Sequence, residues 1–291
     1  MTKLIAPTPR RQPMVPADLA LAAPAWARAW ATKNDAAVVT MTVPGARGLD
    51  GESFRQQTAD AYRRIREALD ATPFAHVVRV WNHIPGIHDR MDDECDRYML
   101  FNAGRFAAVC EWFGGAARIP QCAAAASGVG HDGDDLVIHA LAQAEPGTPV
   151  DNPQQIPAFR YSRRFGPMPP CFARATRVER PRRSLLIAGT AAITGEESRH
   201  VGDADAQLAM TLQNIRILVR EAGWRGASPQ DDPLDRLEHV RVYIARGAGA
   251  ERVAASCREA FHAGASLEFI RADLCRTDLL VEIEGIASLH P

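Results

Sequence analysis

The feature of this sequence that most limits its fold is an internal repeat of one helix–strand unit. An amphipathic pattern at residues 59–69 is followed by a β-branched run at 75–84, and the same order returns at 207–223 and 238–246. Apolar residues that recur every three to four positions predict helices, and short β-branched runs predict strands. The two runs also share letters from their histidine onward, HVVR in the first and HVRV in the second. We therefore expect two copies of one structural unit in tandem.

Each copy continues with a second helical pattern, at residues 95–114 and at 250–264. The predicted fold class is α+β, with two α/β units in tandem, each a mixed sheet backed by two helices. A stretch rich in Pro, Gly and Asn at 145–157 is typical of a linker. It predicts domain boundaries of 1–150 and 151–291.

The two copies differ in their last strands, TDLLVEIEGIA near the end of the chain and DDLVIHALAQA in the first half. Glu282 and Glu284 share one face of the later strand, because successive strand residues point to opposite sides. In the alignment of the copies, His139 lies opposite Glu282 and Leu141 lies opposite Glu284. Either the acidic face of the later strand is the solvated side of a sheet, or one glutamate is a working acid in a cleft.

Composition limits the class of protein. A formal net charge of −1 argues against a protein that binds nucleic acid or anionic membranes. No stretch approaches the roughly 18 apolar residues of a membrane span, and the first residues lack the apolar core of a signal peptide. Residues 1–50 are interpreted as an arm rich in Ala and Pro.

The cysteines are scattered and form no C-x-x-C pair, which indicates neither a metal site nor a disulfide scaffold. They are Cys95, Cys110, Cys122, Cys171, Cys257 and Cys275. We expect a reduced, cytoplasmic protein.

The segment at residues 159–183 carries eight arginines and a single acid, Glu179. Its glycine and prolines predict a loop. Arginine offers a planar fork that binds carboxylates in bidentate fashion, so the loop would suit a small ligand with two carboxylates. The alternatives are a solvated charge run or a patch between domains, and we favour these for Arg180, Arg182 and Arg183.

The next stretch, LLIAGTAAITGEESRHVGD at residues 185–203, reads as a buried strand of small residues followed by a polar turn. Small residues in a strand allow a ligand or another chain to approach its backbone closely. The spacings of phosphate-binding loops, of the G-x-S-x-G elbow and of H-E-x-x-H are absent.

Several motifs together resemble the chorismatase family. They are RYSRRFGPMPPCFARAT, LLIAGTAAITGEESRHVGD and CRTDLLVEIEGIA, with RVWNHIP, FNAGR and SGVGHDGDDLVIHALA in the first half. The resemblance covers most of the chain from about residue 75. The second half is also similar to the YjgF-like reactive-intermediate deaminase superfamily, which has an arginine fifteen residues before its glutamate. Leu267 stands there in this chain, which argues against imine or enamine hydrolysis.

The resemblance implies an enzyme that cleaves the enolpyruvyl ether of chorismate and releases pyruvate, with no metal or organic cofactor. It implies an active site in the second domain, with Glu282 as the general acid. Chorismate is a dianion, and the resemblance assigns its binding to Tyr161, Arg164 and Arg174. Protonating the methylene carbon of a vinyl ether requires a carboxylic acid with a raised pKa, which agrees with this assignment.

The product and the assembly are further expectations. Cys275 resembles the residue of chorismatases that form 3-hydroxybenzoate, alone or with 4-hydroxybenzoate. Ala188, which with Gly189 is expected to contact substrate, fits the hydrolases that form a dihydroxy-cyclohexadienoate. We favour 3-hydroxybenzoate because a polarisable thiol can steer the intermediate towards aromatisation. A non-catalytic aromatic-carboxylate binder is another alternative. Two fused copies predict a monomer, although single-copy relatives form trimers.

Overall fold

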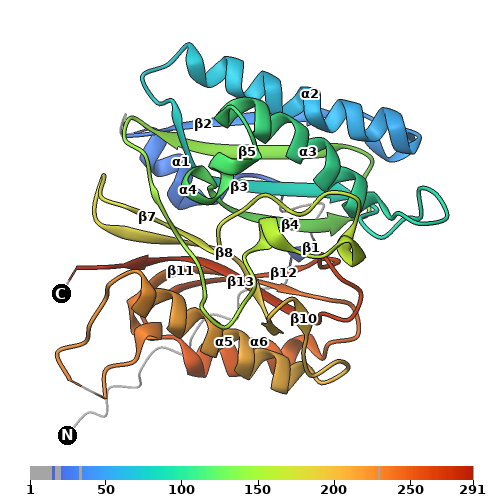
Figure 1. Ribbon diagram of the computed structural model, residues 1–291. Helices are drawn as coiled ribbons and strands as arrows, with labels where there is room; N and C mark the ends of the chain where they lie inside the picture. The colour runs from blue at the N-terminus through green and yellow to red at the C-terminus, as the bar shows by residue number, and fades with distance from the viewer. Residues whose placement is uncertain (1–14, 17–20, 33–34, 229, 291) are drawn as a thin grey trace, which may run out of the picture.

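Two sheets lie one above the other between two pairs of helices (Figure 1). This computed structural model describes residues 15–16, 21–32, 35–228 and 230–290, and the account below concerns those residues. Helices α2 and α3 cover the outer side of the upper sheet, and α5 and α6 cover the outer side of the lower sheet (Figure 1). The order of the layers is therefore helix, sheet, sheet, helix.

The first sheet has the strand order β2-β5-β3-β4. Its strands are β2 (Ala37–Val43), β3 (His76–Pro85), β4 (Ala125–His131) and β5 (Leu136–Gln143). The helices of this half are α1 (Ala25–Thr32), α2 (Gly51–Asp70), α3 (Arg97–Phe113) and the short α4 (Ile119–Cys122). β3 pairs in parallel with β4 and antiparallel with β5, so the sheet is mixed.

The second sheet has the order β1-β12-β11-β13-β8-β7-β6. Its strands are β1 (Val15–Pro16), β6 (Thr148–Val150), β7 (Ala175–Val178), β8 (Ser184–Ala191), β11 (Leu237–Ile244), β12 (Ser266–Arg271) and β13 (Val281–Ser288). Helices α5 (Ala204–Glu221) and α6 (Ala250–Ala260) cover it, and β9 (Ile193–Thr194) forms a small hairpin with β10 (Glu197–Ser198).

The strands β8-β13-β11-β12 repeat the order β2-β5-β3-β4 of the first sheet. Here too the sheet is mixed, because β11 pairs in parallel with β12 and antiparallel with β13. The predicted α+β architecture of two units, each a mixed sheet backed by two helices, is confirmed.

Parts of the expected arm and of the expected loop form strands, because short runs in both segments pair with neighbouring strands. Residues 37–43, in the expected Ala/Pro-rich arm, form β2 and pair with β5 along their whole length. Residues 175–178, in the expected arginine-rich loop, form β7 between β6 and β8. Residues 1–14, 17–20 and 33–34 of the arm lie outside the described residues.

Aspartates set the starts of three long helices. Asp50, Asp96 and Asp203 each accept hydrogen bonds from backbone N–H groups in the first turn of α2, α3 and α5. Such caps satisfy donors that have no partner inside the helix. The cap at Asp50 starts α2 at residue 51, eight residues before the predicted helix.

The registers of the two sheets correct the predicted alignment of the copies. The pairs β3–β5 and β11–β13 each have one irregularity near the start of the first strand. When the two strand pairs are aligned at these irregularities, His139 is the counterpart of Glu284, and Val137 is the counterpart of Glu282. The expected match of His139 with Glu282 is wrong by two residues. A shift of two keeps every side chain on the same face, so the hydrophobic pattern could not detect it.

Apolar side chains also pack between the sheets. Val78, Trp81 and Leu141 of the first unit form one cluster with Leu186 and Ile286 of the second. This buried surface holds the inner faces of the two units together. No helix among the described residues is both long and apolar enough to cross a bilayer.

Candidate active site

A cavity of about 370 Å³ lies between the two units beside β13. Its wall includes Gly189, Cys275 and Glu282 from the second unit, and Tyr98 and Met99 from helix α3 of the first. A cavity of this size suits a small molecule. The sequence-based prediction named residues of the second copy only, so it missed the contribution of α3.

Glu282 is 3% exposed and has few partners. The thiol of Cys275 donates to its Oε2 over 3.9 Å, and the described residues supply no other hydrogen bond to this carboxyl group. Burial raises the pKa of Glu282 to about 8, and the charge of Glu284 adds to the rise, whereas Arg79 and Arg174 oppose it. At neutral pH this side chain is therefore mostly protonated and able to donate a proton.

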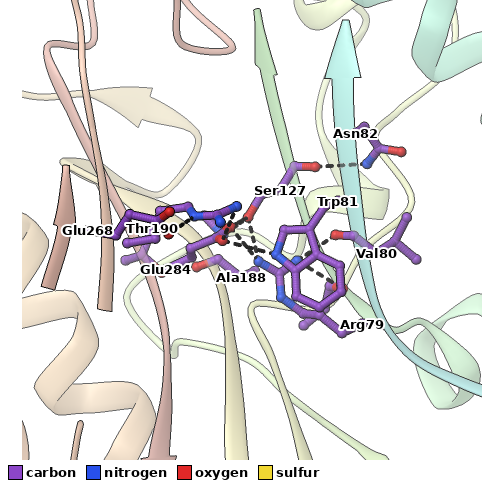
Figure 2. A network of polar contacts seen from close by, with 12 residues as sticks. Arg79, Val80, Trp81, Asn82, Ser127, Ala188, Thr190, Glu268 and Glu284 are labelled. Atoms are coloured by element: carbon purple, nitrogen blue, oxygen red, sulfur yellow. Dashed lines mark hydrogen bonds and ion pairs between the residues drawn. The ribbon is translucent and has the colours of Figure 1, made fainter. Parts of the chain in front are cut away.

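Glu284, two residues along the same strand face, has the opposite surroundings (Figure 2). Its Oε2 accepts hydrogen bonds from Arg79 Nη2 at 2.7 Å and from Ser127 Oγ at 2.5 Å. Its Oε1 accepts from Trp81 Nε1 at 3.0 Å and lies 3.8 Å from Arg241 Nη1. Glu284 is a buried ion-pair partner that links the two sheets.

The solvated-face alternative for the two acids is wrong. Glu282 and Glu284 are each only 3% exposed, and they face the first unit rather than water. The sequence could not reveal this, because the covering residues Arg79, Trp81 and Ser127 lie far away along the chain.

Strand β8 makes room for Glu282 at an irregularity in its pairing with β13. A Cβ atom on Gly189 would lie 2.0 Å from Glu282 Oε1, so any side chain at this position would displace the carboxyl group. The Gly189 N–H donates to Ser127 Oγ at 2.9 Å. Ala188 is fully buried and is not among the residues that line the cavity; its N–H donates to the carbonyl of Arg174. The small residues of this strand thus admit a carboxyl group from a neighbouring strand.

Arg174 and Tyr161 lie together on the cavity wall. Arg174 Nη2 donates to Tyr161 Oη at 2.6 Å and to the carbonyl of Ile156 at 3.1 Å. The Nε of Arg174 is buried and has no hydrogen-bond partner among the described residues. A guanidinium group with an unused donor next to an acid is suited to hold an anion.

Arg164 occupies a more open position. It lines the cavity, but its side chain is 56% exposed and its Nη2 pairs with Glu197 Oε1 at 2.5 Å. Any carboxylate that binds Arg164 must compete with this partner and with water.

Arg276 is a cavity residue that the sequence analysis missed. Its guanidinium carbon lies 4.0 Å from the ring centroid of Phe165, and its Nη1 donates to the carbonyl of Glu196 at 2.7 Å. Arg276 lies outside the arginine-rich stretch, and the one sequence feature that could have identified it is its position directly after Cys275.

Burial raises the pKa of Cys275 to about 12, and the charge of Glu282 contributes to the rise. The side chain is thus a thiol at neutral pH and not the nucleophilic thiolate. No group of three or more His, Cys, Asp and Glu side chains within the described ranges is placed to hold a metal ion. The chemistry available from the side chains described above is proton donation to a bound anion.

Comparisons with known proteins agree over most of the chain. A family model described as Chorismatase FkbO/Hyg5-like, N-terminal, matches residues 23–142. A 3-hydroxybenzoate synthase from Streptomyces hygroscopicus is 32% identical over 243 residues, which cover 80% of this chain and 69% of that protein. A chorismatase from Streptomyces rapamycinicus is 31% identical over 265 residues, which cover 89% and 77%. A chorismatase crystal structure matches with a TM-score of 0.75 and 28% identity, and the match covers 87% of this chain and 75% of that one.

Proposed function

This chain belongs to the chorismatase family, and from that premise we propose that it cleaves the enolpyruvyl ether of chorismate. The products are pyruvate and 3-hydroxybenzoate, the latter alone or with 4-hydroxybenzoate. The observation that carries the proposal is the buried Glu282, whose pKa is raised to about 8 beside a cavity lined by arginines.

Glu282 acts first in the proposed reaction. Its carboxyl O–H protonates the methylene carbon of the enolpyruvyl group, and the adjacent carbon becomes an oxocarbenium ion. The carboxylate left on Glu282 stabilises that cation in surroundings of low dielectric constant. The bond between the ether oxygen and the ring carbon then breaks, pyruvate leaves with that oxygen as its keto oxygen, and the positive charge passes to the ring. The ring hydroxyl moves to the vacated carbon to give 3-hydroxybenzoate, or stays in place to give 4-hydroxybenzoate. A ring proton is lost to the Glu282 carboxylate, which completes aromatisation and restores the acid.

Two carboxylates of chorismate must be held while this happens. Arg174 supports one of them, because its Nε has no partner among the described residues and its guanidinium is braced by Tyr161. Arg276, whose guanidinium group stacks on the ring of Phe165, supports the other carboxylate. Arg164 assists at the opening of the cavity.

The second candidate product is a dihydroxy-cyclohexadienoate. It contains one water molecule more than hydroxybenzoate, because hydrolysis adds a water to the ring and the aromatic product carries none. The thiol of Cys275, 3.9 Å from Glu282, favours the aromatic product, since an apolar thiol keeps water from the ring.

Purified protein mixed with chorismate tests the proposal. Pyruvate should appear well above the uncatalysed background, and chromatography of the same mixture should identify the cyclic product. A background rate of pyruvate release would refute the activity, and a dihydroxy-diene product would refute the aromatic outcome alone.

The Cys275→Ala variant tests the role of the thiol. We expect pyruvate release within a few-fold of the parent and a product mixture that shifts towards the dihydroxy-diene. An unchanged product ratio would remove Cys275 from the explanation.

A further inference from the structure

A second cavity, of about 450 Å³, lies on the inner face of the second sheet near Glu284. Its wall combines helix α1 and the segment before it with strands β3, β11, β12 and β13. The residues that line it include Trp26, Arg79, Arg241 and Glu284, and none of these lines the cavity that holds Glu282. The two cavities are thus separate spaces that share strand β13.

Two arginines and one acid are buried at this second cavity, and a second acid lies at its rim. Arg79 and Arg241 are 1% and 6% exposed, and they face one equally buried acid, Glu284. Arg79 uses its donors on Glu284, on Ser127 and on backbone carbonyls (Figure 2). The remaining partner is Glu268 at the rim, whose side chain is 48% exposed.

Arg241 is the group with an unused donor. Its Nε donates to Glu268 at 2.6 Å, whereas its buried Nη1 has no hydrogen-bond partner among the residues that the structure describes and lies 3.8 Å from Glu284. Leaving a buried donor of a charged group unsatisfied is costly. A carboxylate in the cavity would bind the guanidinium group of Arg241, which lines the wall, in competition with the exposed Glu268.

The rest of the wall is aromatic and small. The rings of Trp26 and Trp81 lie 5.6 Å apart in an edge-to-face arrangement, and Ala22 and Ala23 also line the cavity. Such a wall favours a flat apolar body next to the charged end.

We propose that this second cavity is a binding site for a small aromatic monocarboxylate, with the carboxylate on Arg241 and the ring against Trp26. The site is distinct from the cavity of Glu282, and its occupancy does not depend on turnover of chorismate.

The tryptophans provide the test, because the cavity that holds Glu282 has none in its wall. Benzoate is titrated into ¹⁵N-labelled full-length protein, and the indole N–H signals are assigned from Trp→Phe variants. The signals of Trp26 and Trp81 should shift in a saturable manner, whereas those of Trp112 and Trp224 should not. Benzyl alcohol, which has the ring without the charge, should leave all of them in place.

Three variants test where the effect arises. Ser266→Phe fills the cavity from an exposed position on β12 and should weaken the benzoate response at least tenfold. Ala117→Phe adds the same ring at an exposed position of the first unit and should not. Arg241→Gln should abolish the response, and a folded spectrum is required before that result is interpreted.

The proposal is wrong if benzoate leaves the Trp26 and Trp81 signals unmoved, if Ser266→Phe retains the full response, or if benzyl alcohol gives equal shifts. Pyruvate release is measured separately on the same samples. A protein that binds benzoate here and releases no pyruvate would overturn the proposed function and leave this site standing.

Discussion

The last strands of the two units, β5 and β13, occupy the same place in their sheets but carry different chemistry. β5 presents Val137 and His139 where β13 presents Glu282 and Glu284. The ring of His139 contacts Thr40 Oγ1 at 2.8 Å and a backbone carbonyl at 2.5 Å, so both of its nitrogens are satisfied. In β13, Glu284 is satisfied in the same way, and Glu282 is not.

This difference shows what the second unit adds to a shared framework. A polar residue at the position of His139 or Glu284 is accommodated by partners within reach. The position of Glu282 instead holds a carboxyl group whose one hydrogen-bond partner within the described ranges is the weak donor Cys275. Burial without compensation is what raises a carboxyl pKa, and it is the property that a proton donor needs.

The largest loss of activity is expected when β13, like β5, has no acid at the position of Glu282. Glu282→Gln keeps the size of the side chain and removes the proton, so we expect kcat for pyruvate release to fall about 10³-fold, the usual contribution of a general acid. Substrate binding should change little. Glu251→Gln, at an exposed position of α6, is the matched control and should behave as the parent. Retention of a tenth or more of the activity by Glu282→Gln would exclude Glu282 as the acid.

Replacement of the neighbouring acid, Glu284, should mainly lower the stability of the protein. Glu284→Gln leaves the buried guanidinium of Arg79 without its charge partner at 2.7 Å. Removing one member of a buried pair typically costs about 3–5 kcal/mol, so the free energy of unfolding in urea should fall by that order. A loss below about 1 kcal/mol would mean that water or Glu282 takes over the pairing.

The pH dependence distinguishes the two acids more finely. Below about pH 8 Glu282 retains its proton, so kcat/KM should be level near neutrality and fall roughly tenfold per pH unit above pH 8. Glu284 raises the pKa of Glu282, so in Glu284→Gln this fall should begin at lower pH. An alkaline limb that stays in place would contradict the coupling.

The same proton affects stability. The side chain takes up a proton on folding between pH 4.5, its usual pKa, and about pH 8, so its burial lowers stability progressively as pH rises through that range. Glu282→Gln should therefore gain stability relative to the parent from pH 5 to pH 8, on the order of 3 kcal/mol at neutral pH. The two proteins should unfold alike near pH 4.

The smallest effect is expected in the first unit. Burial lowers the pKa of His139, so the ring is neutral at pH 7. His139→Gln should cost about 1–2 kcal/mol of stability through lost hydrogen bonds and leave pyruvate release unchanged. A large loss of activity would mean that β5 takes part in the chemistry after all.

Local pattern was enough to predict much of this protein. Helical and strand periods predicted both units, and the pair of acids in TDLLVEIEGIA identified the strand beside the cavity. These features depend on residues that are close in sequence, where a face is decided by a period of two or of 3.6. The glycine of IAGTA was likewise readable as a place of close approach, and it faces Glu282.

The tertiary structure decided which acid is paired and which is isolated. Arg79 and Ser127, the partners of Glu284, lie more than 150 residues away along the chain. Tyr98 on α3 also lies far from β13 along the chain, although both line the cavity. The register that makes His139 the counterpart of Glu284 likewise became visible only in the folded structure. A shift of two residues leaves every face unchanged, so the hydrophobic pattern does not select the register, and tertiary contacts decide which acid keeps its proton.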